Sequence, residues 1–190
     1  MIYNKEQVDF KFAYKKQYDT LNIKRKVIEL EEEWKYDTTR QDTFNVHRHT
    51  NSYILNKVSI DWEKDTPLNQ IYRNQNSDLW NLTEPIIKEL EEDCDGEMGQ
   101  VLYVNLPAGK VIDPHEDFGS YLFYICRYHI PIITNPDVGF IVDEEIKFMK
   151  EGECWEINNN KMHSVFNKGN SDRIHLLIDI MPNKFLNRME

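Results

Sequence analysis

Short apolar segments at close, regular spacing fill the chain from residue 99 onward, and they constrain the fold more than any other feature. Turn-forming residues such as Pro107 and Gly109 separate them. We expect strands at 99–106, 111–117, 121–133, 140–142, 146–149, 154–157, 164–166 and 173–181. Many short strands with turns between them indicate two packed sheets or a closed barrel. The sequence therefore predicts a jelly-roll core over residues 99–181.

Residues before 99 predict an α-helical and strand extension of that core. Val27, Leu30 and Trp34 recur at spacings of three and four, which is typical of a helix with one apolar face. We expect helices at 21–34 and 83–91, strands at 43–50 and 52–60, and a polar loop at 65–76. The length of 190 residues fits one domain. The prediction is a single α+β domain, with residues 1–98 as the extension and the helices outside the core.

Composition excludes several classes of partner. The net charge of −10 makes a long phosphate backbone an unsuitable ligand. The most apolar run, 121–133, contains two basic side chains and is too short to span a bilayer. The three cysteines form no CxxC pair and the N-terminus lacks the apolar core of a signal peptide, so we expect free thiols in the reducing cytoplasm. We expect no nucleic acid or membrane partner, and the sequence leaves the oligomeric state open.

Two histidines and one aspartate form a candidate metal site. His115 and Asp117 are two positions apart, so their side chains share a face if that segment is extended. His163 follows on a later predicted strand. Two imidazoles and one carboxylate leave half of an octahedral metal's positions open, as in non-haem Fe(II) oxygenases. The His-x-Asp tripeptide alone is a weak signal, because such tripeptides occur by chance.

The last predicted strand supplies a candidate anion clamp. Arg173 lies ten positions after His163, and a guanidinium binds carboxylates with two hydrogen bonds. The even positions of 173–180 are all apolar, whereas Arg173, His175 and Asp179 occupy odd positions. One face of this strand therefore belongs to the apolar core, and we expect the other to face a site. A surface ion pair of Arg173 is the alternative.

Arg127 and His129 repeat this pattern within an otherwise apolar segment. A charge in such surroundings is costly unless it is paired. A bound dianionic ligand would be one partner for Arg127. An internal salt bridge to an acid such as Glu156 or Asp179 would be another.

These residues together resemble the aspartyl/asparaginyl β-hydroxylase-like 2-oxoglutarate (2OG) dioxygenases, a group that includes free-proline hydroxylases. The residues that carry the resemblance are 115–117, 127–129, 152–155, 163 and 173–179. Their order and spacing agree with the family from about Tyr103 to Ile180. The resemblance is specific for the family and its chemistry and leaves the substrate open.

The resemblance implies a double-stranded β-helix that uses Fe(II), O₂ and 2OG as co-substrate. It implies His115, Asp117 and His163 as the iron ligands. It also implies that Arg173 holds the distal carboxylate of 2OG, with Arg127 and His129 near its other end or near the substrate. The β-hydroxylases place a serine on the strand before the Pro107 turn, where this chain has Tyr103 and Asn105, so we expect one of these two in that contact.

The expected reaction is hydroxylation of a C–H bond of an amino acid, free or within a peptide, of the Asp, Asn or Pro type, with release of succinate and CO₂. A carboxylate ligand argues against the halogenase variant of this chemistry, which leaves that position empty for halide. The candidates for the substrate side are Asn105, Trp155, His175, His47 and His49. Two alternatives stay open: a cupin-like metal-dependent hydrolase or isomerase, and a non-catalytic β-barrel that binds a ligand.

Overall fold

The computed structural model describes residues 9–30, 33–34, 42, 45–61, 66–75 and 77–186. The helices are α1 (Leu21–Glu29), α3 (Asp78–Cys94), α4 (Ser120–Tyr124) and α5 (Asn183–Leu186), with a 3₁₀ turn η3 (Asn45–His47). The strands of the first half are β1 (Phe12–Gln17), β2 (Asn51–Asp61), β3 (Thr66–Arg73) and β4 (Gly96–Leu106). Those of the second half are β5 (Val111–His115), β6 (Cys126–Ile133), β7 (Val138–Val142), β8 (Glu145–Lys147), β9 (Glu153–Ile157), β10 (His163–Asn167) and β11 (Arg173–Pro182).

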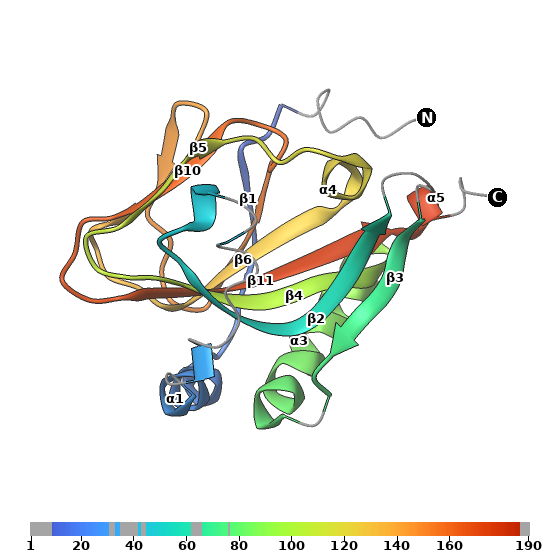
Figure 1. Ribbon diagram of the computed structural model, residues 1–190, viewed down its shortest axis with the longest axis horizontal. Coiled ribbons are helices and arrows are strands. Elements are labelled where there is room, and N and C mark those ends of the chain that lie inside the picture. The colour runs from blue at the N-terminus through green and yellow to red at the C-terminus, as the bar shows by residue number, and fades with distance from the viewer. Residues whose placement is uncertain are drawn as a thin grey trace.

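The strands form two antiparallel sheets that face each other, which confirms the predicted jelly roll (Figure 1). The large sheet has the order β1-β9-β6-β11-β4-β2-β3, and the small sheet has the order β5-β10-β7-β8. Apolar side chains from both sheets meet between them, among them Leu106, Ile112, Phe140, Ile157 and Val165. The site described below lies in this space between the sheets.

The other face of the large sheet carries the helices. α1 and α3 lie beneath this sheet in Figure 1, and β5 and β10 lie above it. All four even-numbered apolar residues of β11 (Ile174, Leu176, Ile178 and Ile180) belong to the core between this sheet and the helices. The alternation read from the sequence of β11 therefore assigns its two faces correctly.

The N-terminal residues contribute strands to the large sheet as well as helices. β1 pairs with β9, and β2 pairs with β4. The predicted strand at 52–60 is confirmed as part of β2. Helix α1 ends at Glu29, earlier than predicted, and Trp34 lies in a separate short turn. No helix among the described residues is long and apolar enough to cross a membrane.

Four local predictions are wrong. The 65–76 segment contains β3, an edge strand of the large sheet that pairs with β2. Residues 45–47 of the predicted strand at 43–50 form η3, and residues 43 and 44 lie outside the described residues. Helix α3 begins earlier than residue 83, because the hydroxyl of Ser77 accepts a hydrogen bond from the backbone N–H of Trp80 and caps it. The run 121–133 divides into α4 and β6, since an apolar run of this length does not distinguish a helix from a strand.

Candidate metal centre and active-site cavity

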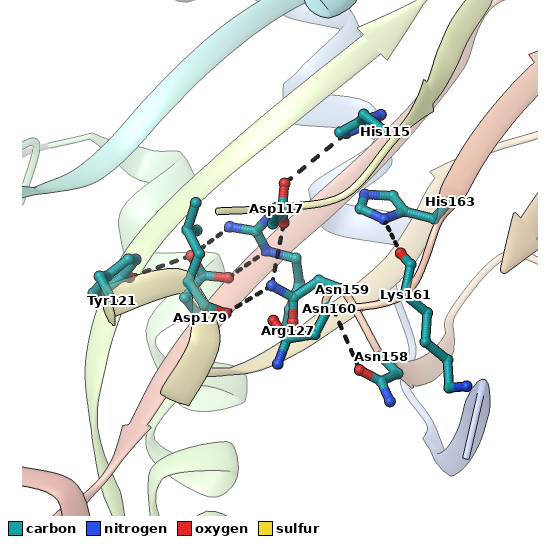
Figure 2. A network of polar contacts seen from close by, with 11 residues as sticks. His115, Asp117, Tyr121, Arg127, Asn158, Asn159, Asn160, Lys161, His163 and Asp179 are labelled. Carbon is teal, nitrogen blue, oxygen red and sulfur yellow. Dashed lines mark hydrogen bonds and ion pairs between the residues drawn. The ribbon is translucent and has the colours of Figure 1, made fainter. Parts of the chain in front are cut away.

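Two neighbouring strands of the small sheet bring the predicted metal ligands together. His115 ends β5, His163 begins β10, and the two residues are direct partners in the register of these antiparallel strands. Asp117 follows β5, and its backbone N–H donates to the carbonyl of Asn159 at 3.2 Å. One ligand atom from each of these three side chains lies within 4.8 Å of those from the other two. Figure 2 shows the three side chains converging.

The hydrogen bonds of both imidazoles leave the same nitrogen available for a metal. Nδ1 of His115 donates to the carbonyl of Asp113 at 2.8 Å, and Nδ1 of His163 donates to the carbonyl of Lys161 at 2.9 Å. A carbonyl oxygen only accepts, so Nδ1 carries the proton in each ring and Nε2 keeps its lone pair. Ligating histidines in metalloproteins are held in the same way. The donor set therefore fits a divalent cation.

The carboxylate of Asp117 is held through one oxygen. Its Oδ2 accepts hydrogen bonds from Nη1 of Arg127 and, at 3.2 Å, from Nδ2 of Asn159. Its Oδ1 lies 3.9 Å from Nε2 of His115. Burial acts to raise the pKa of Asp117, but the charge of Arg127 and the neighbouring imidazoles outweigh it, so the pKa is lowered. Asp117 is therefore a carboxylate with one oxygen directed toward the histidines.

Arg127 is bound by a second buried carboxylate. Its Nε and Nη2 donate to the two oxygens of Asp179 at 2.8 and 2.9 Å, a bidentate pair. The hydroxyl of Tyr121 donates to Asp179 at 3.2 Å and accepts from the backbone N–H of Gln100 at 2.8 Å. Of the two partners that the sequence left open for Arg127, the structure has the internal salt bridge. These contacts form a chain from Tyr121 to the metal cluster (Figure 2).

A cavity that opens to solvent lies between the two sheets around this cluster, with about 410 Å³ of space not filled by atoms, part of it open solvent. Its polar lining residues are His47, His115, Asp117, Arg127, His129, His163 and Arg173, and its apolar lining residues are Val104, Ile112, Phe140, Val165 and Leu177. The apolar lining limits the water available to compete with a ligand.

Arg173 enters the cavity from the start of β11. Its side chain is 1% exposed, and its Nη2 donates to Nδ1 of His175 at 2.6 Å. Because Nδ1 accepts from a guanidinium, the ring of His175 is neutral. Burial, followed by the charge of Arg173 and by His129, holds the pKa of His175 well below its usual value. His175 thus orients Arg173 without adding a second positive charge.

Five of the predicted site residues do not line the cavity: Tyr103, Asn105, Trp155, His175 and His49. Val104 points into it, so its neighbours Tyr103 and Asn105 point to the helix side of β4. There the hydroxyl of Tyr103 bonds that of Thr83 at 2.6 Å, and Nδ2 of Asn105 donates to Asp172 at 3.0 Å. Nε1 of Trp155 donates to Glu153 at 3.0 Å, and Trp155 does not line the cavity.

The sequence analysis did not assign a site role to two residues that hold Asp117 in place. Asn159 hydrogen-bonds Asp117 directly, and Asp179 acts through Arg127. Asp179 was considered only as a salt-bridge partner and Asn159 not at all. A sequence signal existed for Asp179, because it is an acidic residue in an otherwise apolar strand. His47 was one of several substrate-side candidates. It lines the cavity with its ring edge-to-face with that of His115, at 5.6 Å between centroids.

The burial of His163 predicts how the metal-free protein responds to pH. Burial outweighs the charge of Asp117 and lowers the pKa of His163 to about 4, from 6.5. Between these values the unfolded chain binds a proton that the folded chain does not, so stability falls as the pH falls. The lowered pKa of Asp117 adds a loss only at still lower pH. We expect urea unfolding to show lower stability at about pH 5 than at about pH 7.

Replacement of His163 by glutamine should remove the part of that dependence that His163 contributes, and the part from His175, whose pKa is also lowered by burial, should remain. His49 provides the matched control, because it lies outside the metal cluster, with its Nε2 accepting from Arg48. His49→Gln should retain the dependence. An equal loss of stability with pH in wild type and His163→Gln would contradict the assignment.

Comparison with known proteins gives a family and a fold. A family model described as aspartyl/asparaginyl beta-hydroxylase matches residues 25–182. No curated protein matches the sequence significantly.

Similar solved structures include a viral collagen prolyl hydroxylase from Paramecium bursaria chlorella virus-1 in complex with 2OG. It has a TM-score of 0.60 at 6% identity, over 92% of this chain and 97% of that one. Another is HygX from Streptomyces hygroscopicus with nickel and 2OG bound, with a TM-score of 0.57 at 12% identity, over 90% and 82% of the two chains. A third is the non-heme monooxygenase ThoJ in its nickel complex, with a TM-score of 0.55 at 10% identity, over 90% and 73%. At these identities the similarity shows a common fold.

Proposed function

This chain belongs to the aspartyl/asparaginyl β-hydroxylase family, and on that premise we propose that it is an Fe(II)- and 2OG-dependent dioxygenase. It hydroxylates a C–H bond of an amino acid, free or within a peptide, of the Asp, Asn or Pro type, and it releases succinate and CO₂. The observation that carries the proposal is the His115, Asp117 and His163 cluster in one cavity with Arg173.

We assign Nε2 of His115, Nε2 of His163 and Oδ1 of Asp117 as the iron ligands. Iron bound in this way supplies the oxidation chemistry that activates O₂. The protein residues fix the tautomers, hold the carboxylate charged and surround the metal with apolar side chains. Arg127 has a positioning role in this assignment, because its guanidinium already binds Asp117 and Asp179.

We assign Arg173 to the distal carboxylate of 2OG, with His129 beside it in the cavity. A buried guanidinium oriented by a neutral His175 suits a dianionic co-substrate. Two structural neighbours contain 2OG, which supports 2OG as the co-substrate but not a particular residue for it. Tyr103 is left out of the co-substrate site because its hydroxyl is engaged on the other face of β4.

On the substrate side, we assign His47 of η3. An ion pair of 2.8 Å between Arg48 and Asp113 ties this turn to β5, and Asp113 also orients His115 through its carbonyl. The substrate is a small amino acid or a short peptide. We propose the cytoplasm as the location; Cys94, Cys126 and Cys154 form no disulfide in the described part of the chain, which agrees with a reducing compartment.

Succinate release tests this function. The protein is supplied with Fe(II), 2OG and O₂ and screened against the common amino acids and short peptides that contain Asp, Asn or Pro. Succinate formation that rises with one substrate and requires Fe(II) supports the hydroxylase. A metal-dependent hydrolase would turn over a substrate without 2OG, and a binding module would bind a ligand without releasing succinate. Either result would refute the proposal.

Replacement of Arg173 by alanine should mainly raise the KM for 2OG. A charged hydrogen-bonding group contributes about 1.5–3 kcal/mol, so we expect the KM to rise roughly ten- to a hundredfold. The measurement is the dependence of succinate release on 2OG concentration. Tyr103→Phe is the control from the other face of the sheet and should leave the KM unchanged. An unchanged KM in Arg173→Ala would exclude Arg173 from the co-substrate site.

A further inference from the structure

A pair of cysteines lies on the helix side of the large sheet, outside the metal cavity. Cys94 is the last residue of α3, and Cys126 is the first residue of β6. Cys126 is 8% exposed and belongs to the core between the sheet and the helices, and Cys94 is partly buried against the same core. Neither residue lines the metal cavity. The pair is therefore separate from the proposed iron site.

The strand register places the two cysteines at the same end of the large sheet. Cys126 is opposite Ile180 of β11. The chain that leaves α3 enters β4 at Gly96, which is opposite Pro182, two positions later in β11. At this end of the sheet the two thiols meet, and the side chain of Cys94 is hydrogen-bonded to that of Cys126. A helix end and a strand start, distant in sequence, thus bring two sulfur atoms into contact.

Two donors are directed at the sulfur of Cys94. It accepts hydrogen bonds from the thiol of Cys126 and from the hydroxyl of Tyr128, which keeps its proton because burial raises its own pKa. The ammonium of Lys15 lies 6.0 Å from the centre of the Tyr128 ring and also forms an ion pair with Glu156 at 2.8 Å. The hydrogen bond from Cys126, aided by Tyr128 and Lys15, outweighs burial and lowers the pKa of Cys94. Cys94 is therefore the more reactive thiol of the pair.

The third cysteine lacks these features. Cys154 is fully buried, and burial raises its pKa to about 12. The thiolate is the reactive form of cysteine, so Cys154 is inert at neutral pH. Cys94, in contrast, is partly exposed and has a second cysteine beside it. An accessible thiol of low pKa next to a resolving cysteine is the arrangement of redox-sensing sites.

We propose that Cys94 and Cys126 form a reversible disulfide when the protein meets a peroxide. With hydrogen peroxide, the sulfur of Cys94 attacks one oxygen and the O–O bond breaks, which gives a sulfenic acid and one water. The sulfur of Cys126 then displaces the hydroxyl of the sulfenic acid, which forms the S–S bond and releases a second water. The two thiols lose two electrons and the peroxide gains them. A thiol reductant reverses the reaction, so the bridge is transient in a reducing compartment.

The bridge closes a loop that carries two of the proposed iron ligands. The loop runs over residues 94–126 and contains His115 and Asp117. Closing a loop restricts the unfolded chain, so the disulfide stabilises the fold. Arg127 follows Cys126 and lines the metal cavity, on the opposite face of β6, so its contact with Asp117 is kept. The oxidised protein therefore resists unfolding better, with its metal site intact.

Thiol mapping after peroxide treatment tests this proposal. The full-length protein is reduced, freed of metal with a chelator to exclude reactions of iron with peroxide, treated with hydrogen peroxide and alkylated. We expect Cys94 and Cys126 to be lost as free thiols and recovered as one cross-linked peptide pair in the monomer, while Cys154 stays alkylatable. Dithiothreitol should restore both thiols. The melting temperature should rise by at least about 4 °C on oxidation.

Variants connect the bridge to the pair. Cys154→Ala is the matched control and should form the bridge as wild type does. Cys94→Ser should form no bridge and show no rise in melting temperature, and Cys126→Ser should leave Cys94 as a sulfenic acid that dimedone traps. A disulfide to Cys154, a disulfide only between molecules, or a melting temperature that does not rise in oxidised wild type would overturn the proposal. None of these measurements needs 2OG turnover, so their outcome is separate from that of the proposed function.

Discussion

Replacing Asp117 by alanine is expected to abolish Fe(II)-dependent succinate release. The substitution removes one of three proposed ligands and also removes a carboxylate partner of Arg127. Neither histidine can replace the lost oxygen, because each has its Nδ1 engaged with a backbone carbonyl and already offers its Nε2. Since the iron site is the source of the chemistry, we expect activity to fall by at least about a thousandfold, or more than about 4 kcal/mol in transition-state stabilisation.

The neighbouring carboxylate provides the control for this experiment. Glu116 lies between the two ligands in sequence, and its side chain does not line the cavity. Glu116→Ala should therefore retain Fe(II) binding and succinate release close to wild type. Bound iron is measured together with activity, so that loss of metal is separated from loss of fold. Full activity in Asp117→Ala, or equal losses in both variants, would contradict the assignment of Asp117.

Replacing Asp179 by asparagine is expected to destabilise the metal-free protein by about 3–5 kcal/mol. Asp179 is 1% exposed and neutralises Arg127 through two hydrogen bonds. The amide keeps the shape of the side chain but removes its charge, which leaves the buried guanidinium with Asp117 alone. Urea unfolding monitored by fluorescence gives the change in free energy.

Two comparison variants separate the contribution of the Arg127–Asp179 ion pair to stability from the contributions of neighbouring groups. Tyr121→Phe removes the hydroxyl that bonds Asp179 and keeps both charges, so the loss should be only about 1–2 kcal/mol. Asp137→Asn changes an exposed aspartate and should have almost no effect. If Asp179→Asn destabilised the protein no more than Tyr121→Phe, the ion pair would not be what holds Arg127 in place.

Patterns that depend on one strand were predictable from the sequence. The alternation in β11 assigns its even-numbered apolar residues to the helix side and Arg173 to the cavity side, because strand side chains point alternately to opposite faces. The His115 and Asp117 spacing places both residues at one end of β5. His163 was placed only by its order and spacing, yet the register of β10 sets it opposite His115.

Features that depend on contacts between distant segments were not predictable. The cost of burying Arg127 was evident, but its partner is 52 positions away in sequence, and several acids were available. The sequence did not show whether Val104 or its neighbours Tyr103 and Asn105 face the cavity. This depends on the position of α3, because Thr83 of α3 hydrogen-bonds the hydroxyl of Tyr103. β3 was missed because its polar and apolar residues do not alternate regularly, and its pairing with β2 was not visible in the sequence.

Anaerobic addition of 2OG to the Fe(II)-loaded protein tests the central claim most directly. Chelation of iron by 2OG gives a visible metal-to-ligand charge-transfer band, and this observation needs no knowledge of the substrate. Our assignment predicts that the band appears in wild type and in Glu116→Ala, that it disappears in Asp117→Ala, and that Arg173→Ala requires more 2OG to produce it. Absence of the band in wild type that binds Fe(II) would contradict the proposed iron and 2OG site.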